Sequence, residues 1–217
     1  MNRAHMQPRI YDITPPVTDR LGVWPGDTKL SREVLCDLHK GDTVTLSTLR
    51  ATVHLGAHAD GPNHYDPKGG GVGEQSLEFY LGSCQLIDAR VARGGRVGVA
   101  DLALGSSGIT QKRVLIRTGT FPNPEAWNED FAALAPKLID HLADRGVITI
   151  GIDTPSVDVQ NSKDLPTHKA VARRGMAILE GLLLRDVPAG EYELIALPLK
   201  LMGFDASPIR AVLRTLA

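Results

Sequence analysis

Glycine and proline divide this chain into short apolar segments, and this punctuation limits what the chain can fold into. The 217 residues include 22 glycines and 14 prolines. Glycine loses more conformational entropy on folding than other residues, and proline lacks the N–H group that helices and sheets need. The sequence therefore predicts many short strands joined by turns, with few helices.

Seven segments have the β-branched and apolar content, bounded by turn residues, that is typical of strands. They are residues 10–13, 30–38, 43–53, 83–91, 113–117, 147–152 and 191–197. In the third segment the apolar positions change parity, from Val44 and Leu46 to Leu49. A β-bulge near Ser47 or Thr48 is expected to absorb this change.

Helical spacing is clearest over residues 128–145, where apolar residues recur three and four positions apart. Pro136 interrupts the pattern, so we expect the helix itself to begin there and to stop at Gly146. Shorter helices are predicted at 169–174 and at 208–216, the latter with Ser207 as its cap. The length suits one domain over residues 1–217, and no linker composition argues for a boundary.

Composition narrows the possible partners. Hydrophobic residues make up 42% of the chain and charged residues 23%, with a formal net charge of -1, so there is no basic stripe for nucleic acid. No stretch approaches the roughly 18 apolar residues that a membrane span needs, and residues 1–16 lack the apolar region of a signal peptide. The sequence predicts a cytoplasmic protein that binds neither nucleic acid nor membranes.

The chemistry is concentrated in one run of eleven residues, which contains His54, His58, Asp60 and His64. In an extended strand His54 and His58 would lie about 13 Å apart, too far to share an ion. Gly56 and Gly61 allow the chain to curl, and curling could point all four side chains into one cavity. Imidazoles and a carboxylate are ligands for Zn²⁺, Mn²⁺ or Co²⁺, and Asp60 has two oxygens with which to bridge two ions.

Other interpretations of this run remain open. The four side chains could be ordinary surface or core residues, although four potential ligands in eleven positions make coordination the better hypothesis. Within a metal site His64 could be a further ligand or could transfer protons. Asp66 could orient the His64 ring or be a solvated loop acid. Elsewhere, Glu180 lies in the apolar stretch 176–184, where burial is costly unless the carboxylate is paired or bound to metal.

The run 54–64 resembles the signature of the cyclase-like metal hydrolases, and within that family it is similar to the bacterial kynurenine formamidases. Ala57 replaces the threonine of the signature, which removes no ligand. The resemblance extends over essentially the whole chain through four further segments: 23–27, 151–156, 176–181 and 192–200.

The resemblance implies an α/β fold of swivelling β/β/α type, with a mixed sheet or barrel-like core flanked by helices. It implies a pair of zinc ions. His54, His58 and Asp60 would bind the first ion, Asp60 and His168 the second, and Glu180 both.

The same resemblance implies roles for two further residues and for the protein as a whole. His64 would move the proton, and Trp24 would lie against an aromatic substrate ring. The implied reaction is hydrolysis of N-formyl-L-kynurenine to L-kynurenine and formate, a step of tryptophan degradation, carried out by a homodimer.

Two rival functions remain. Another amide or lactam hydrolase of the same superfamily, acting on an isatin-like ring, would share every ligand and differ in its pocket. A non-enzymatic module would use the ions only to brace its loops. The sequence contains no Gly-x-Ser-x-Gly segment, so nothing points to a serine nucleophile. Asp153, at the end of a predicted strand, is expected to cap a loop or to support the site rather than to react.

Overall fold

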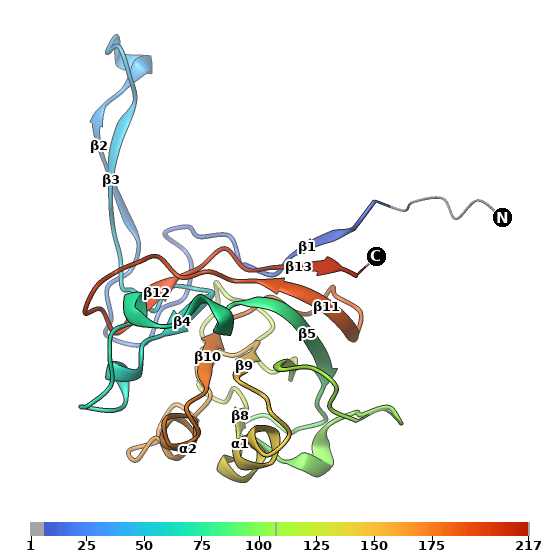
Figure 1. Ribbon diagram of the computed structural model, residues 1–217. Coiled ribbons are helices and arrows are strands. Elements are labelled where there is room, and N and C mark those ends of the chain that lie inside the picture. The colour runs from blue at the N-terminus through green and yellow to red at the C-terminus, as the bar shows by residue number, and fades with distance from the viewer. Residues whose placement is uncertain (1–6, 107, 217) are drawn as a thin grey trace, which may run out of the picture.

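Nine short strands combine into one mixed sheet that curls strongly into a half-barrel, as the computed structural model in Figure 1 shows. The structure describes residues 7–106 and 108–216. In spatial order the strands are β1 (Ile10–Asp12), β13 (Val212–Thr215), β11 (Gly190–Ile195), β5 (Leu81–Asp88), β7 (Arg113–Arg117), β9 (Thr149–Ile152), β10 (Ala177–Glu180), β4 (His58–Asp60) and β12 (Ala206–Pro208). With two α-helices against it, this sheet gives the α/β class that the sequence predicts.

The centre of the sheet is parallel and its margins are antiparallel. Strands β5, β7, β9 and β10 run in parallel, whereas β4 pairs antiparallel with both β10 and β12. Helices α1 (Pro136–Ala143) and α2 (Pro166–Arg174) lie side by side below the parallel strands in Figure 1. Strand β9 is buried along its whole length, as expected for a parallel strand covered on both faces.

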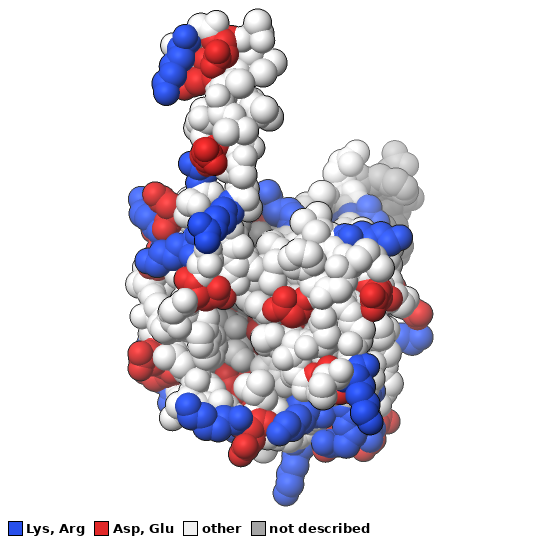
Figure 2. Space-filling view, turned by 90° about the vertical axis from the view of Figure 1, so that its left-hand side faces the viewer, with Lys and Arg blue, Asp and Glu red and all other residues white. Residues whose placement is uncertain are grey.

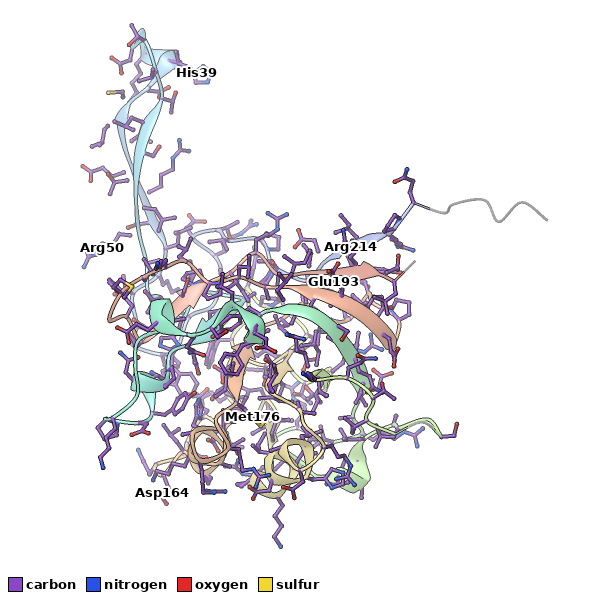
Figure 3. The ribbon with its side chains drawn as sticks, in the orientation of Figure 1. His39, Arg50, Asp164, Met176, Glu193 and Arg214 are labelled. Carbon is purple, nitrogen blue, oxygen red and sulfur yellow. The ribbon has the colours of Figure 1, made fainter. Side chains whose placement is uncertain are left out.

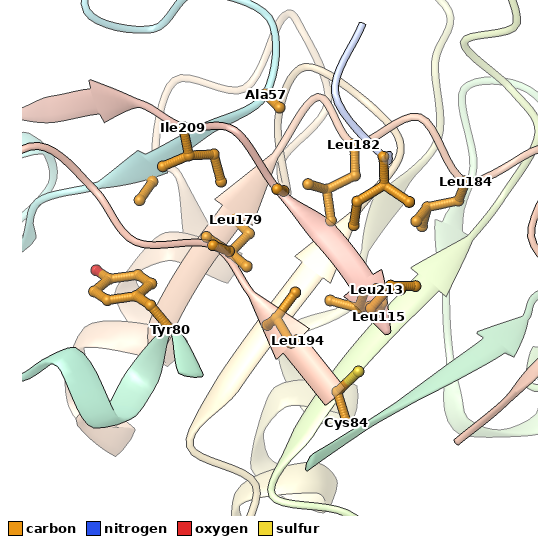
Figure 4. Close-up of a cluster of buried hydrophobic side chains, with 14 of the residues drawn as sticks. Ala57, Tyr80, Cys84, Leu115, Leu179, Leu182, Leu184, Leu194, Ile209 and Leu213 are labelled. Atoms are coloured by element: carbon orange, nitrogen blue, oxygen red, sulfur yellow. The ribbon is translucent and has the colours of Figure 1, made fainter. Parts of the chain in front are cut away.

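The alternation of side chains along β10 separates two hydrophobic clusters. Ile178 belongs to the cluster that includes Leu138 and Leu142 of α1, and Leu179 belongs to the cluster inside the curl of the sheet, shown in Figure 4. Because successive strand residues point to opposite faces, Glu180 points to the same side as Ile178. A carboxylate is thereby directed toward the side of the sheet that the helices cover.

Every predicted strand has a counterpart, and so do two of the three predicted helices. Segments 30–38 and 43–53 form β2 (Ser31–Cys36) and β3 (Leu46–Arg50), a separate two-stranded ribbon. The bulge lies in β2, between Val34 and Cys36, rather than at Ser47 or Thr48 on the opposite strand. Helix α1 begins at Pro136 as predicted, and Gly146 follows it with a positive φ of 80°.

The predicted helix at 208–216 is wrong. Strand β12 ends at Pro208, and β13 occupies most of the remaining segment because it pairs with β1 on one side and β11 on the other. Two rows of interstrand hydrogen bonds outweigh a local helical pattern in so short a segment. Residues 128–135 are not helical either, since β8 (Ala133–Leu134) pairs with β6 (Arg96–Val97).

Short 3₁₀ helices complete the described structure: η1 (Leu38–Lys40), η2 (Pro62–His64), η3 (Val72–Glu74), η4 (Leu77–Phe79) and η5 (Val99–Asp101). None of the helices among the described residues is long and apolar enough to cross a membrane.

Candidate metal centre

Strands β4 and β10 bring three of the predicted ligands together. His58 and Asp60 are two residues apart on β4 and therefore share one face of the strand. Glu180 is the antiparallel neighbour of His58, and cross-strand neighbours have adjacent side chains. As a result, His58 Nε2 lies 3.3 Å from Glu180 Oε2 and 3.5 Å from Asp60 Oδ1.

His54 and His168 approach the same carboxylates from outside these strands. Gly56, with a positive φ of 58°, turns the chain between His54 and β4, and His54 Nδ1 lies 3.3 Å from Asp60 Oδ1. His168, in the first turn of α2, has its Nε2 atom 3.6 Å from both Asp60 Oδ2 and Glu180 Oε1. The structure thus brings His54, His58 and His168 around the two Asp60 oxygens, with Glu180 beside His58 and His168. We expected residues 54–64 to form a curled loop, but residues 58–60 of this run form strand β4.

Three atoms at the centre of this cluster show that a cation fits there. Asp60 is fully buried, and neither of its oxygens has a hydrogen-bond partner, nor does His58 Nε2. His58 Nδ1 donates to Gly56 O at 2.9 Å, which leaves Nε2 facing the carboxylates. Buried acceptors facing one another are costly unless a cation lies between them, and a divalent metal ion would satisfy all three.

Two groups of potential ligand atoms share Asp60, and a third consists of His54, His64 and Asp205. Donor atoms of His54, His58 and Asp60 lie within 4.8 Å of one another, and so do those of Asp60, His64 and His168. A carboxylate with one oxygen toward each group is the arrangement that a bridging ligand requires.

Neighbouring groups fix the orientation of His168. Its Nδ1 atom lies 2.9 Å from Asp158 Oδ2, so that Nδ1–H donates to the carboxylate and Nε2 faces the cluster. Asp158 is itself held by Arg96, at 2.7 Å, and by the backbone N–H of Thr167. Nothing in the sequence distinguished Asp158 from the other acidic residues.

The electrostatics of the centre favour positive charge. Burial opposes protonation of His54, but the adjacent carboxylates of Asp60 and Asp205 raise its pKa to about 9. Burial likewise opposes protonation of His168, yet Asp158 and Asp60 raise its pKa to about 10. Against the effect of burial, the surrounding imidazoles hold the pKa of Asp60 well below its usual range. Carboxylates that hold protons on imidazoles in this way also attract metal ions.

His64 lies at the outer side of the cluster. It ends helix η2, its side chain is 34% exposed, and its ring centroid is 4.3 Å from that of His54. Burial lowers its pKa below the ordinary value, which favours the neutral ring that can accept a proton. Asp205 Oδ2 lies 3.9 Å from His64 Nδ1 and 2.9 Å from His54 Nε2, whereas Asp66 accepts from Lys68 N.

A cavity of about 620 Å³ opens beside these groups. Its lining includes the candidate ligands His54, His58, His168 and Glu180 and the aromatic side chains of Trp24, Phe121 and Trp127. Trp24 is 38% exposed, and its ring meets that of Trp127 edge-on, with centroids 5.6 Å apart.

Asp153, which also lines the cavity, caps a loop. Its carboxylate accepts hydrogen bonds from the backbone N–H groups of Thr118 and Gly119. This agrees with the expected supporting role.

The curled sheet and its cluster of imidazoles and carboxylates define a cyclase-like protein with a candidate metal centre. The model of the family described as "Putative cyclase" matches residues 11–159, more than half of the chain. The chain belongs to this family of cyclase-like metal hydrolases.

Solved structures agree with this assignment. A potential metal-dependent hydrolase with cyclase activity is 29% identical, with a TM-score of 0.80, and the match covers 97% of this chain and 100% of that one. A predicted metal-dependent hydrolase from Bacillus stearothermophilus is 30% identical, with a TM-score of 0.78 and coverage of 96% and 99%. Isatin hydrolase A from Labrenzia aggregata, at 22% identity, shares the fold, with a TM-score of 0.83 and coverage of 97% and 94%.

Proposed function

We propose that this protein is a metal-dependent arylformamidase that hydrolyses N-formyl-L-kynurenine to L-kynurenine and formate. The observation that carries the proposal is the fully buried Asp60, whose two unpartnered oxygens face imidazoles beside an aromatic-lined cavity. The similarity to metal-dependent hydrolases at about 30% identity supports hydrolysis. The aromatic wall suits an aryl substrate.

In this proposal His54, His58 and Asp60 would hold one ion, Asp60 and His168 would hold a second, and Glu180 would contribute to both sites. When bound, the ions activate water and polarise the formyl carbonyl. His64 accepts a proton from the attacking water at an unprotonated ring nitrogen and delivers it to the aniline nitrogen as the C–N bond breaks. Trp24 packs against the aromatic ring of the substrate and excludes water from that side.

The proposal extends to the metal, the oligomeric state and the cellular compartment. We propose Zn²⁺ as the native ion, with Mn²⁺ or Co²⁺ able to occupy the same donors. The protein would act as one domain over residues 1–217, as a homodimer in the cytoplasm, in tryptophan degradation.

The test compares hydrolysis by the zinc-loaded parent, a His64→Ala variant and a His141→Ala control. His141 is on α1, away from the cluster, and loses an imidazole without touching the site. Removing a general acid or base costs about 10²–10⁴-fold in rate, so His64→Ala is expected to lose activity while retaining metal. A parent that does not hydrolyse formyl-kynurenine would refute the function. A His64→Ala variant as fast as the parent would refute only the proton transfer.

A second candidate is hydrolysis of a lactam ring such as that of isatin. It is favoured by the fold shared with isatin hydrolase A from Labrenzia aggregata. Comparing kcat/KM for formyl-kynurenine and isatin on the same preparation separates the two. The non-enzymatic alternative, in which the ions only brace the loops, predicts turnover of neither substrate and a coordinatively closed metal site without exchangeable water.

A further inference from the structure

Selection of a substrate by the cavity depends more on its aromatic side chains than on charge. On the face of the molecule in Figure 2, basic and acidic side chains are mixed. Outside the metal centre and its histidines, the charged residues that line the cavity are Asp27, Asp153 and Arg185. Each of the three already has a hydrogen-bond partner in the backbone. The aromatic side chains are therefore the lining groups best suited to recognise a ring.

Trp127, which no sequence pattern singled out, is the central ring of this aromatic wall. Three other rings meet it edge-on, with centroids 5.6 Å away for Trp24, 5.5 Å for Phe121 and 6.1 Å for Phe131. Phe131 is fully buried, whereas the other three rings line the cavity. Edge-on pairs at these distances are favourable. The wall is thus a packed cluster in which Trp127 contacts every other member.

A close backbone contact holds the two tryptophans together. Gly22 N donates to Pro124 O at 2.8 Å. A Cβ atom at Gly22 would lie 2.9 Å from Pro124 O and 3.5 Å from Trp127 Cε3. The absence of a side chain at Gly22 therefore lets the segment that carries Trp24 lie close to the segment that carries Trp127.

Gln160 fixes the rotation of the Trp127 ring. It lies in the loop that leads to Asp164 and α2 (Figure 3). An indole has one N–H donor and no acceptor, and Trp127 Nε1–H donates to Gln160 Oε1 at 2.8 Å. The second side-chain torsion of tryptophan is broad, so packing against other rings determines it only in part. The hydrogen bond adds a directional restraint, because it weakens steeply when the N–H turns away from its acceptor.

The same loop contacts the metal centre. Three residues before Gln160, Val157 N donates to Glu180 Oε1 at 2.7 Å. Asp158, between them, orients His168. One short stretch of backbone thus contacts two proposed ligands and the aromatic wall, and it sets the distance between them.

We propose that Gln160 is a positioning residue that makes the site selective for an aryl group, by holding Trp127 at a fixed place relative to the metal centre. The ligand class is a flat aromatic ring that bears the amide to be cleaved, so the inference rests on the proposed function. Gln160 acts through Trp127 and does not itself contact the reacting atoms. Its loss should raise KM for aryl amides and leave kcat unchanged, because it weakens binding of the ring and removes no reacting group.

The chain supplies its own probe, because its two tryptophans, Trp24 and Trp127, both line the cavity. Binding of L-kynurenine, the proposed product, is measured by quenching of their fluorescence in the metal-loaded protein. Gln160→Leu is expected to weaken this binding about 3–10-fold, the contribution of one hydrogen bond. Gln160→Glu keeps an acceptor for the indole and should bind as the parent does. So should the matched control Gln111→Leu, because Gln111 bonds to Glu191 instead.

A double-mutant cycle separates positioning of Trp127 from a general loss of structure. Trp127→Phe keeps an aromatic ring but removes the N–H donor, so Gln160→Leu should have no further effect on binding in that background. In the parent background, Gln160→Leu should raise KM for N-formyl-L-kynurenine by the same factor as the dissociation constant of L-kynurenine. Its metal content, measured by elemental analysis, should equal that of the parent.

Three results would overturn the proposal. They are a parent that does not bind L-kynurenine, a Gln160→Leu variant that binds it as tightly as the parent, and an equal loss from Gln160→Leu in the Trp127→Phe background. A parent that binds L-kynurenine and shows the expected cycle, but does not hydrolyse the formyl compound, would instead refute the arylformamidase activity alone.

Discussion

Asp60 is the residue on which the candidate centre depends, because no other side chain there is both fully buried and without hydrogen-bond partners at both oxygens. Asp60→Asn keeps the size of the side chain but removes its charge and one of its acceptor oxygens. We expect this variant to lose bound metal, as measured by elemental analysis after dialysis against the metal-free buffer. Asp66→Asn, in the same segment but bonded to the Lys68 backbone, should retain it. Equal metal content in Asp60→Asn and the parent would contradict the assignment.

Asp158 acts through His168 rather than by contact with the ion. Its carboxylate holds His168 Nδ1–H at 2.9 Å and thereby directs Nε2 into the cluster. Replacing such an orienting group costs about 10–100-fold in metal affinity. We expect that loss for Asp158→Asn in a competition titration with a chromogenic chelator. Asp144→Asn is the control because Asp144 pairs with Arg174 on the surface, and a similar loss in both variants would argue against orientation.

The sequence reveals the residues of this centre unevenly. His54, His58, Asp60 and His64 stand out because four potential ligands fall within eleven positions. Asp205 contacts His54 across 151 positions of sequence, and no local pattern marks it. Asp66 is nearer in the chain to His64, but its carboxylate turns to its own loop. Proximity in sequence therefore pointed to the four candidates of the run 54–64, but not to His168, which only the resemblance implied, nor to the groups that orient the imidazoles.

At the level of elements, a close approach between two loops determines where β10 ends relative to β4. Gly181, directly after Glu180, has a positive φ of 65°, and a Cβ atom there would lie 2.1 Å from Gly56 O. Gly181→Ala must therefore separate the segments that carry Glu180 and His58. Gly175 has a similar φ of 62° but open space around it.

We expect Gly181→Ala to lower the free energy of unfolding by about 3 kcal/mol or more, since overpacking adds to backbone strain. Gly175→Ala has only the strain and should cost about 1 kcal/mol. Urea unfolding of the two variants and the parent measures both changes. Equal losses of stability in the two variants would show that the chain moves away from Gly56 O at no energetic cost when a Cβ atom is added at position 181.

Elements with a local signal were predictable, and those defined by pairing were not. Strand β7 was located from its three consecutive apolar residues, Val114, Leu115 and Ile116, and α1 from its spacing after Pro136. Strand β4 consists of His58, Ala59 and Asp60, which have little strand propensity. It is a strand because β10 and β12 pair with it on both sides. The failed helix at 208–216 has the same cause, because interstrand pairing decides the conformation of a short segment.

For the whole molecule, the centre joins parts of the chain that would otherwise have few reasons to stay together. Its five proposed ligands come from the segment before β4, from β4 itself, from α2 and from β10. An ion that binds only when these elements are assembled stabilises the assembled state. Without it, the unpartnered Asp60 oxygens oppose burial.

Metal removal should therefore lower the thermal stability of the whole chain. With free ion at about 100 times its dissociation constant, one site contributes about 2.7 kcal/mol. For a chain of this size that corresponds to a decrease in the unfolding midpoint of roughly 5–10 °C. We expect this decrease by calorimetry when the metal-loaded parent is stripped with a chelator, and recovery when Zn²⁺ is restored. Asp60→Asn should show no shift in either direction, because the chelator then has no ion to remove. A parent that loses its metal without any change in midpoint would mean that the ion does not join these elements.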